Sequence, residues 1–93
     1  MARELFVGEL KISRRTAEKI LTVHGIHEDE LRATIEDQGA LPFSWHHDRE
    51  RGWRAIVKVI IRERLCLVVL YPAEDEYSEV WSLGSAYPDE PLK

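Results

Sequence analysis

The stretch WRAIVKVIIRERLCLVVLY, residues Trp53–Tyr71, carries the strongest structural signal in this 93-residue chain. It contains two apolar runs, Trp53–Ile61 and Leu65–Tyr71, on either side of the charged triplet Arg62-Glu63-Arg64. Both runs are rich in valine, isoleucine and aromatic residues and lack glycine and proline, a composition typical of β-strands. A short polar segment between two such runs favours a tight reversal. The stretch therefore predicts an antiparallel hairpin at the centre of the domain.

The two predicted strands carry different patterns. Neighbouring side chains in a strand point to opposite faces, so Arg54 and Lys58 share one face of the first strand, and Arg62 follows them. The second strand is apolar at every position from Leu65 to Leu70, which is typical of a strand covered on both faces. We therefore predict a basic stripe, made of Arg54, Lys58 and Arg62, beside a strand at the centre of the sheet.

The composition indicates one small globular domain. Hydrophobic residues make up 44% of the chain and charged residues 32%, which is ordinary for such a domain. Residues 1–64 contain twelve Lys and Arg against eleven Asp and Glu, whereas residues 65–93 contain one against six. The net charge of −4 therefore argues against indiscriminate nucleic-acid binding but is compatible with a local basic surface.

Cysteine usage and hydropathy bear on the compartment. The lone cysteine, Cys66, lies inside the second apolar run, where a small buried side chain is expected and no internal disulfide can form. No apolar run reaches the roughly 20 residues of a membrane span, and the N-terminus lacks the apolar core of a signal peptide. These features predict a cytoplasmic protein without a membrane partner.

The segment before the hairpin begins with a strand and a helix. A loosely alternating strand is expected over Leu5–Ile12. The next pattern predicts a helix over Arg14–His24, with Ser13 as its N-cap and Gly25 as its end. The residues expected on the inward side of this helix are Ala17, Ile20, Leu21 and His24.

The remaining segments complete an α+β pattern. A second helix is expected from His27 to about residue 38, with Glu30 in the position of the acidic partner of a capping box. Its inward residues are Leu31, Thr34 and Ile35. Short strands are expected over Phe43–His47 and Tyr77–Ser85. The order βααββββ predicts a two-helix hairpin packed on an antiparallel β-sheet over residues 1–87, followed by a polar tail over residues 88–93.

Short motifs along the chain carry a family resemblance. They are Glu18-Lys19-Ile20, His24-Gly25-Ile26, Glu30-Leu31, the turn from His47 to Arg51, Leu67–Tyr71 and Leu83–Tyr87. With the element order, these motifs resemble the RelE/ParE toxin superfamily, and most closely its BrnT-like branch. The resemblance implies a RelE/ParE-like fold and a toxin component of a type II toxin–antitoxin pair. It also implies metal-independent endoribonuclease activity on RNA and a cognate antitoxin-like protein as partner.

The resemblance also suggests site residues. Metal-free RNA cleavage needs an acid or base and cations that stabilise the phosphorane. The positions assigned to catalysis are His47, Arg51 and Arg54, and those assigned to phosphate or RNA binding are Lys58, Arg62 and Lys19. After Ser85-Ala86 the family continues into a basic helix, whereas this chain continues with Tyr87-Pro88-Asp89-Glu90-Pro91. Whether the chain is an enzyme is therefore left open.

A second function class fits the same residues. The basic stripe is also typical of a solvated sheet face flanked by acids. The alternative hypothesis is a non-catalytic protein-interaction module of the same fold, which binds a protein partner or forms a homodimer. The adjacent His46 and His47 point to opposite faces of a strand, so no metal site and no cofactor are predicted. The tryptophans Trp45, Trp53 and Trp81 are expected to pack in the core or in a protein contact rather than to stack on bases.

Overall fold

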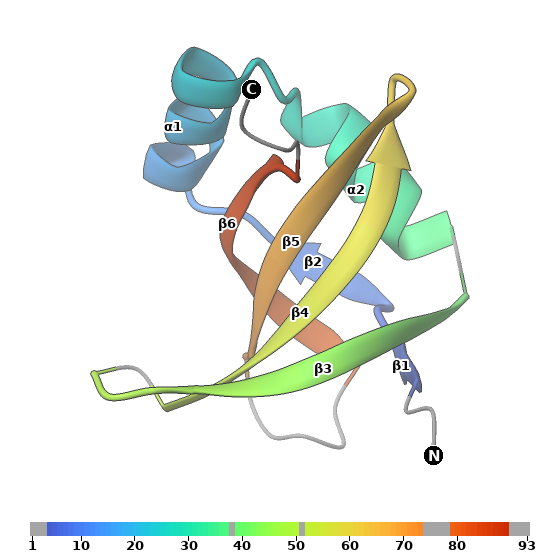
Figure 1. The fold of residues 1–93 in the computed structure, drawn as a ribbon, viewed down its shortest axis with the longest axis vertical. Coiled ribbons are helices and arrows are strands. Elements are labelled where there is room, and N and C mark those ends of the chain that lie inside the picture. The colour runs from blue at the N-terminus through green and yellow to red at the C-terminus, as the bar shows by residue number, and fades with distance from the viewer. Residues whose placement is uncertain (1–3, 38, 51, 74–78, 90–93) are drawn as a thin grey trace.

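A computed structural model of the chain describes residues 4–37, 39–50, 52–73 and 79–89. The helices are α1 (Arg14–His24) and α2 (Glu28–Asp37). The strands are β1 (Glu4–Phe6), β2 (Glu9–Lys11), β3 (Ala40–Asp48), β4 (Gly52–Ile61), β5 (Arg64–Pro72) and β6 (Val80–Pro88). These elements confirm the predicted α+β class (Figure 1).

The central hairpin is formed by β4 and β5, as predicted. The strands pair antiparallel from Ala55 opposite Leu70 to Ile61 opposite Arg64. The turn therefore contains two residues, Arg62 and Glu63, whose φ angles are 51° and 66°. Two positive φ angles at these positions match the right-handed twist of a tight hairpin. Arg64, which was expected in the turn, is the first residue of β5.

The N-terminal segment forms two strands, so the prediction of one strand over Leu5–Ile12 was wrong. The chain bends at Val7 and Gly8, where the Gly8 N–H donates to the carbonyl oxygen of Glu79 over 2.8 Å. A Cβ atom at Gly8 would lie 3.2 Å from the Cβ of Glu79, so this bend favours glycine.

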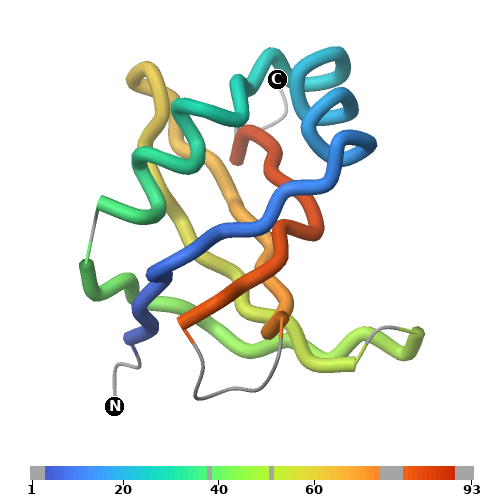
Figure 2. Tube along the Cα trace, turned by 180° about the vertical axis from the view of Figure 1, so that it is seen from behind, coloured from blue at the N-terminus to red at the C-terminus, as the bar shows by residue number. Residues whose placement is uncertain are grey.

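The bend sends β1 and β2 to opposite edges of the sheet. The strand order is β1-β3-β4-β5-β6-β2, in which β1 pairs antiparallel with β3 and β2 pairs parallel with β6. The sheet is therefore mixed, and the expected purely antiparallel sheet was wrong. Because β1 and β2 adjoin in the chain, the two edges approach each other and the sheet curls (Figures 1 and 2).

Helix α1 begins and ends where its caps predict. The Ser13 hydroxyl accepts a hydrogen bond from the Thr16 N–H over 3.1 Å, and Gly25 ends α1 with a φ of 69°. Ile20 is buried, but Leu21, which was expected to face inward, is 44% exposed. Helix α1 packs mainly against β6, at the side of the sheet, and so buries a narrower face than predicted.

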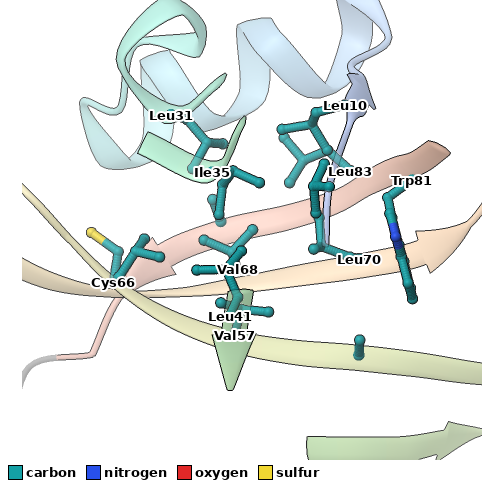
Figure 3. Close-up of a cluster of buried hydrophobic side chains, with 14 of the residues drawn as sticks. Leu10, Leu31, Ile35, Leu41, Val57, Cys66, Val68, Leu70, Trp81 and Leu83 are labelled. Atoms are coloured by element: carbon teal, nitrogen blue, oxygen red, sulfur yellow. The ribbon is translucent and has the colours of Figure 1, made fainter. Parts of the chain in front are cut away.

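The core lies between the concave side of the curled sheet and α2. Leu31 and Ile35 of α2 are fully buried and point toward Val68 and Leu70 of β5 (Figure 3). The Glu36 carboxylate accepts a hydrogen bond from the Leu10 N–H over 2.9 Å and so joins α2 to β2. Neither described helix is long and apolar enough to cross a membrane.

The outer boundaries of the strands differ from the sequence-based ones. Strand β3 begins at Ala40 and not at Phe43, because residues 40–42 pair with the edge strand β1, from Ala40 opposite Phe6 to Pro42 opposite Glu4. Strand β6 covers Val80–Pro88 instead of Tyr77–Ser85, and residues 77 and 78 lie outside the described part. Pro88 still pairs with Cys66, within the stretch predicted to be a polar tail.

Candidate functional site

The β4–β5 hairpin has an inner face, which lies against the core, and an outer face, which is turned away from it. The inner face is made of Ala55, Val57, Val59, Ile61, Cys66, Val68 and Leu70, all of them buried. The outer face is made of Arg54, Ile56, Lys58, Ile60, Leu65, Leu67 and Val69. Figure 1 shows the outer face from the front, with α2 behind the hairpin, and Figure 2 shows α2 in front of the same strands.

The end of the outer face beside the hairpin turn is apolar and open. Strand pairing places Ile60 opposite Leu65 and Ile56 opposite Val69. Ile60 is 66% exposed and Leu65 is 40% exposed, whereas Val69 is buried. The expectation that β5 is covered on both faces was therefore wrong at Leu65, whereas Leu67 is half-buried and Val69 is buried. An exposed apolar surface of this kind is typical of a contact site for another molecule.

Val69 is buried because an aromatic ring covers the neighbouring part of the sheet. A Cβ atom added to Gly84 of β6 would overlap the Tyr71 ring, whose Cδ2 would lie only 2.9 Å away. The same added atom would lie 3.4 Å from the Val69 side chain. Tyr71 therefore packs on the bare backbone of Gly84, next to an irregularity in the pairing between Val69 and Leu70.

Arg62, the last member of the basic stripe, is bound to α2. The Arg62 Nε donates a hydrogen bond to Glu30 Oε2 over 2.7 Å, and the Arg62 Nη2 lies 2.7 Å from Glu30 Oε1. The hydrogen bond from Arg62 lowers the pKa of the Glu30 carboxyl below its ordinary value, and the pair raises the pKa of Arg62. Glu30 was predicted to serve a capping box; instead its carboxylate fixes the tip of the hairpin to α2.

The other two members of the basic stripe also lie beside carboxylates. Arg54 lies 3.6 Å from Asp48, and Lys58 lies 3.9 Å from Asp89. Both distances exceed hydrogen-bonding distance, so these are loose ion pairs. The Nε atom of Arg54 is shielded from solvent and meets no hydrogen-bond acceptor among the described residues. The two cations and two carboxylates balance. No local pattern indicated Asp89, which is far from Lys58 along the chain.

The predicted catalytic residues do not form one cluster in the described structure. His47 pairs with Trp53, and His46 pairs with Arg54, so the His47 and Arg54 side chains point to opposite faces of the β3–β4 ribbon. Arg51 lies outside the described residues. Lys19 is exposed on α1, which Figure 1 places far from the turn between β3 and β4.

The three tryptophans form a row on the side of β3 and β4 that faces the core. The Trp45 ring lies 6.2 Å from the buried Trp81 ring and 6.4 Å from the Trp53 ring. Trp53 in turn packs edge-on against His47 with a ring separation of 5.0 Å. Core packing is confirmed for Trp45 and Trp81, whereas Trp53 is 59% exposed.

Two concavities lie on the helical side of the molecule. The larger, of about 580 Å³, lies between the first turns of the two helices and is lined by Arg14, Glu18, Leu21 and Asp29 among others. The smaller, of about 330 Å³, lies between α2 and the outer face and is lined by Ala33, Thr34, Asp37 and Ile60. Within the described ranges, no group of three or more His, Cys, Asp or Glu side chains could hold a metal ion.

Comparisons of the chain with protein-family models, with curated proteins and with solved structures find no match in any of the three. The likeness to the RelE/ParE superfamily therefore rests on the sequence motifs alone.

Proposed function

We propose that this domain is a protein-interaction module that binds a polypeptide partner through its outer face. The observation that carries the proposal is the open apolar end of that face beside the hairpin turn, where Ile60 is 66% exposed and Leu65 is 40% exposed. Burying such side chains is favourable by roughly 25 cal/mol per Å² of apolar surface. The apolar sequence of β5 is typical of a strand that is covered on both faces. A partner bound to the outer face would supply the cover on that side.

The charges on the outer face also favour a protein partner over RNA. RNA binding depends on cations that neutralise phosphates. Here Arg62 is held by Glu30 over 2.7 Å, and Arg54 and Lys58 each lie beside a carboxylate of the same chain. Cleavage would further require His47 and Arg54 to act on one phosphate, although their side chains point to opposite faces. We therefore place binding ahead of the ribonuclease hypothesis.

The RelE/ParE-like fold and a role in a type II toxin–antitoxin pair remain part of this proposal. Their support is the helical hairpin that precedes a run of antiparallel strands, together with the motifs around His24-Gly25-Ile26 and His47. Under this reading, the chain would also bind a cognate antitoxin-like protein.

Site-specific photo-crosslinking in the cells that encode the chain would test the proposal. The variant Ile60→p-benzoylphenylalanine places the reactive group on the outer face, and Val23→p-benzoylphenylalanine places it on α1, where Val23 is 62% exposed. We expect one defined protein adduct from position 60 and none from position 23. Equal labelling at both positions, or no adduct at position 60, would show that the outer face is not a binding surface.

A further inference from the structure

The outer face has a charge arrangement that an identical face can complement. Each of its loosely held cations has a carboxylate beside it, Arg54 with Asp48 and Lys58 with Asp89. A two-fold axis places the same surface on both sides of an interface, so residue i meets residue j and j meets i. A copy of this face can therefore offer a carboxylate to every cation and a cation to every carboxylate.

We infer that the partner on the outer face is a second copy of this chain, related by a two-fold axis. This inference rests on the proposed function, because it names the occupant of the same surface. The apolar side chains Ile56, Ile60, Leu65 and Leu67 would form the centre of the interface. Lys58, which lies between Ile56 and Ile60 on β4 and opposite Leu67, would exchange its Asp89 partner with the second copy.

Exchanging the partners of these loose ion pairs between two copies costs little free energy. The Lys58 and Asp89 side chains are 65% and 40% exposed and 3.9 Å apart, and exposed ion pairs of this kind contribute little to stability. The Arg62–Glu30 pair, with both contacts at 2.7 Å, is not available for exchange. It instead anchors the tip of the hairpin to α2, so the outer face is already ordered before a partner arrives.

Charge balance also distinguishes a second copy from other occupants. A strongly acidic or strongly basic partner would satisfy one sign of charge and leave the other opposed, which is unfavourable at an interface. The large apolar side chains exposed on this face are Ile60 and Leu65, a small apolar surface, and small interfaces are typical of weak, transient complexes. We therefore expect a dimer that dissociates in the micromolar range.

Sedimentation velocity of the full chain between about 1 and 500 µM would test this dimer. We expect the weight-average mass to rise from one chain toward two over this range. Ile60→Lys places an unpaired charge in the centre of the interface and should weaken association at least about tenfold. Val23→Lys, at a similarly exposed position on α1, should leave association unchanged. A chain that stays monomeric throughout, or equal effects of the two variants, would overturn the inference.

A charge-exchange pair of variants tests the two-fold arrangement directly. Lys58→Glu leaves two carboxylates side by side, and Asp89→Lys leaves two cations, so each variant alone should associate more weakly than the natural chain. An equimolar mixture should recover association, because each copy then offers the charge that the other lacks. A mixture that associates no better than the separate variants overturns the two-fold pairing.

The two proposals fail in different ways. In the photo-crosslinking experiment, an adduct of twice the mass of the chain supports the second copy. An adduct of another mass keeps the outer face as a binding surface but removes the second copy as its occupant. Absence of any adduct at position 60 removes both.

Discussion

The inner and outer faces of the β4–β5 hairpin are both rich in aliphatic side chains, but their surroundings differ. On the inner face, Val57, Val68 and Leu70 are completely buried beneath α2. On the outer face, Ile60 and Leu65 are 66% and 40% exposed. The difference shows that an apolar strand is covered only where the chain supplies a second layer, and this chain supplies that layer on one side.

The size of the chain explains why the second cover is missing from the described structure. A domain of this length buries only about 60–65% of the surface of its unfolded chain. Its two helices have 11 and 10 residues, and both are used on the concave side and at the rim of the sheet. Neither of these helices therefore covers the outer face.

The largest expected effect comes from making the same substitution, leucine to alanine, on each of the two faces of β5. Leu70→Ala on the inner face should lower the free energy of unfolding by about 2–5 kcal/mol, because Leu70 is fully buried and its removal leaves a cavity. Leu65→Ala on the outer face should cost less than about 1 kcal/mol. Urea denaturation at low protein concentration, where the monomer dominates, measures both values.

The same pair of variants can contradict the comparison. If Leu65→Ala destabilised the monomer as strongly as Leu70→Ala, the outer face would be covered within the monomer. The proposed contact surface would then be lost, whatever its charges.

A second prediction concerns the part of the outer side of the sheet where the Tyr71 ring packs on Gly84. Gly84→Ala adds a methyl group where the Tyr71 ring lies, so the ring must move and unfolding should become easier by about 1–3 kcal/mol. Thermal unfolding followed by circular dichroism measures the change. Adding Gly84→Ala to a Tyr71→Ser background should cost clearly less. An equal cost in both backgrounds would show that the ring does not require the glycine.

Local signals in the sequence were sufficient to predict the ends of α1 and the central hairpin, because both depend on residues that are close together in the chain. Ser13 and Gly25 gave both ends of α1 because a cap depends on neighbouring backbone groups. The β-branched runs gave the central hairpin because its two strands are close in sequence and pair with each other.

Features that depend on distant pairing could not be predicted. The bend at Gly8 sends β1 to β3 and β2 to β6, and nothing within residues 5–12 specifies those partners. The basic stripe was identified correctly as a row of cations, but Glu30 and Asp89, which lie beside two of them, come from other elements. The pattern thus indicated the cations of this face but neither the carboxylates beside them nor the exposure of Ile60 and Leu65.

A third prediction tests the turn that joins the two faces. Glu63 has a φ of 66°, a left-handed conformation that costs a non-glycine residue about 1–2 kcal/mol. Glu63→Gly should therefore raise the free energy of unfolding by about 1 kcal/mol, after allowing for the greater freedom of glycine in the unfolded chain. Glu63→Ala removes the same carboxylate without relieving the backbone and should change little. Equal values for the two variants in chemical denaturation would contradict the assigned turn.

The smallest expected effect depends on pH and concerns the anchor of the hairpin tip. The Arg62 guanidinium lowers the pKa of Glu30 in the folded state below its ordinary value of 4.5. A carboxyl whose folded pKa is depressed stabilises the fold above its unfolded pKa, and that contribution is lost as the pH falls through the folded pKa. The stability advantage of the natural chain over Glu30→Gln should therefore be constant above about pH 4.5 and shrink below it. Glu28→Gln removes a first-turn charge from the same helix but keeps the Arg62–Glu30 pair. If urea denaturation over this pH range gave the same profile for both variants, the dipole of α2 and not the bond to Arg62 would account for the effect, and the outer face would lack its anchor.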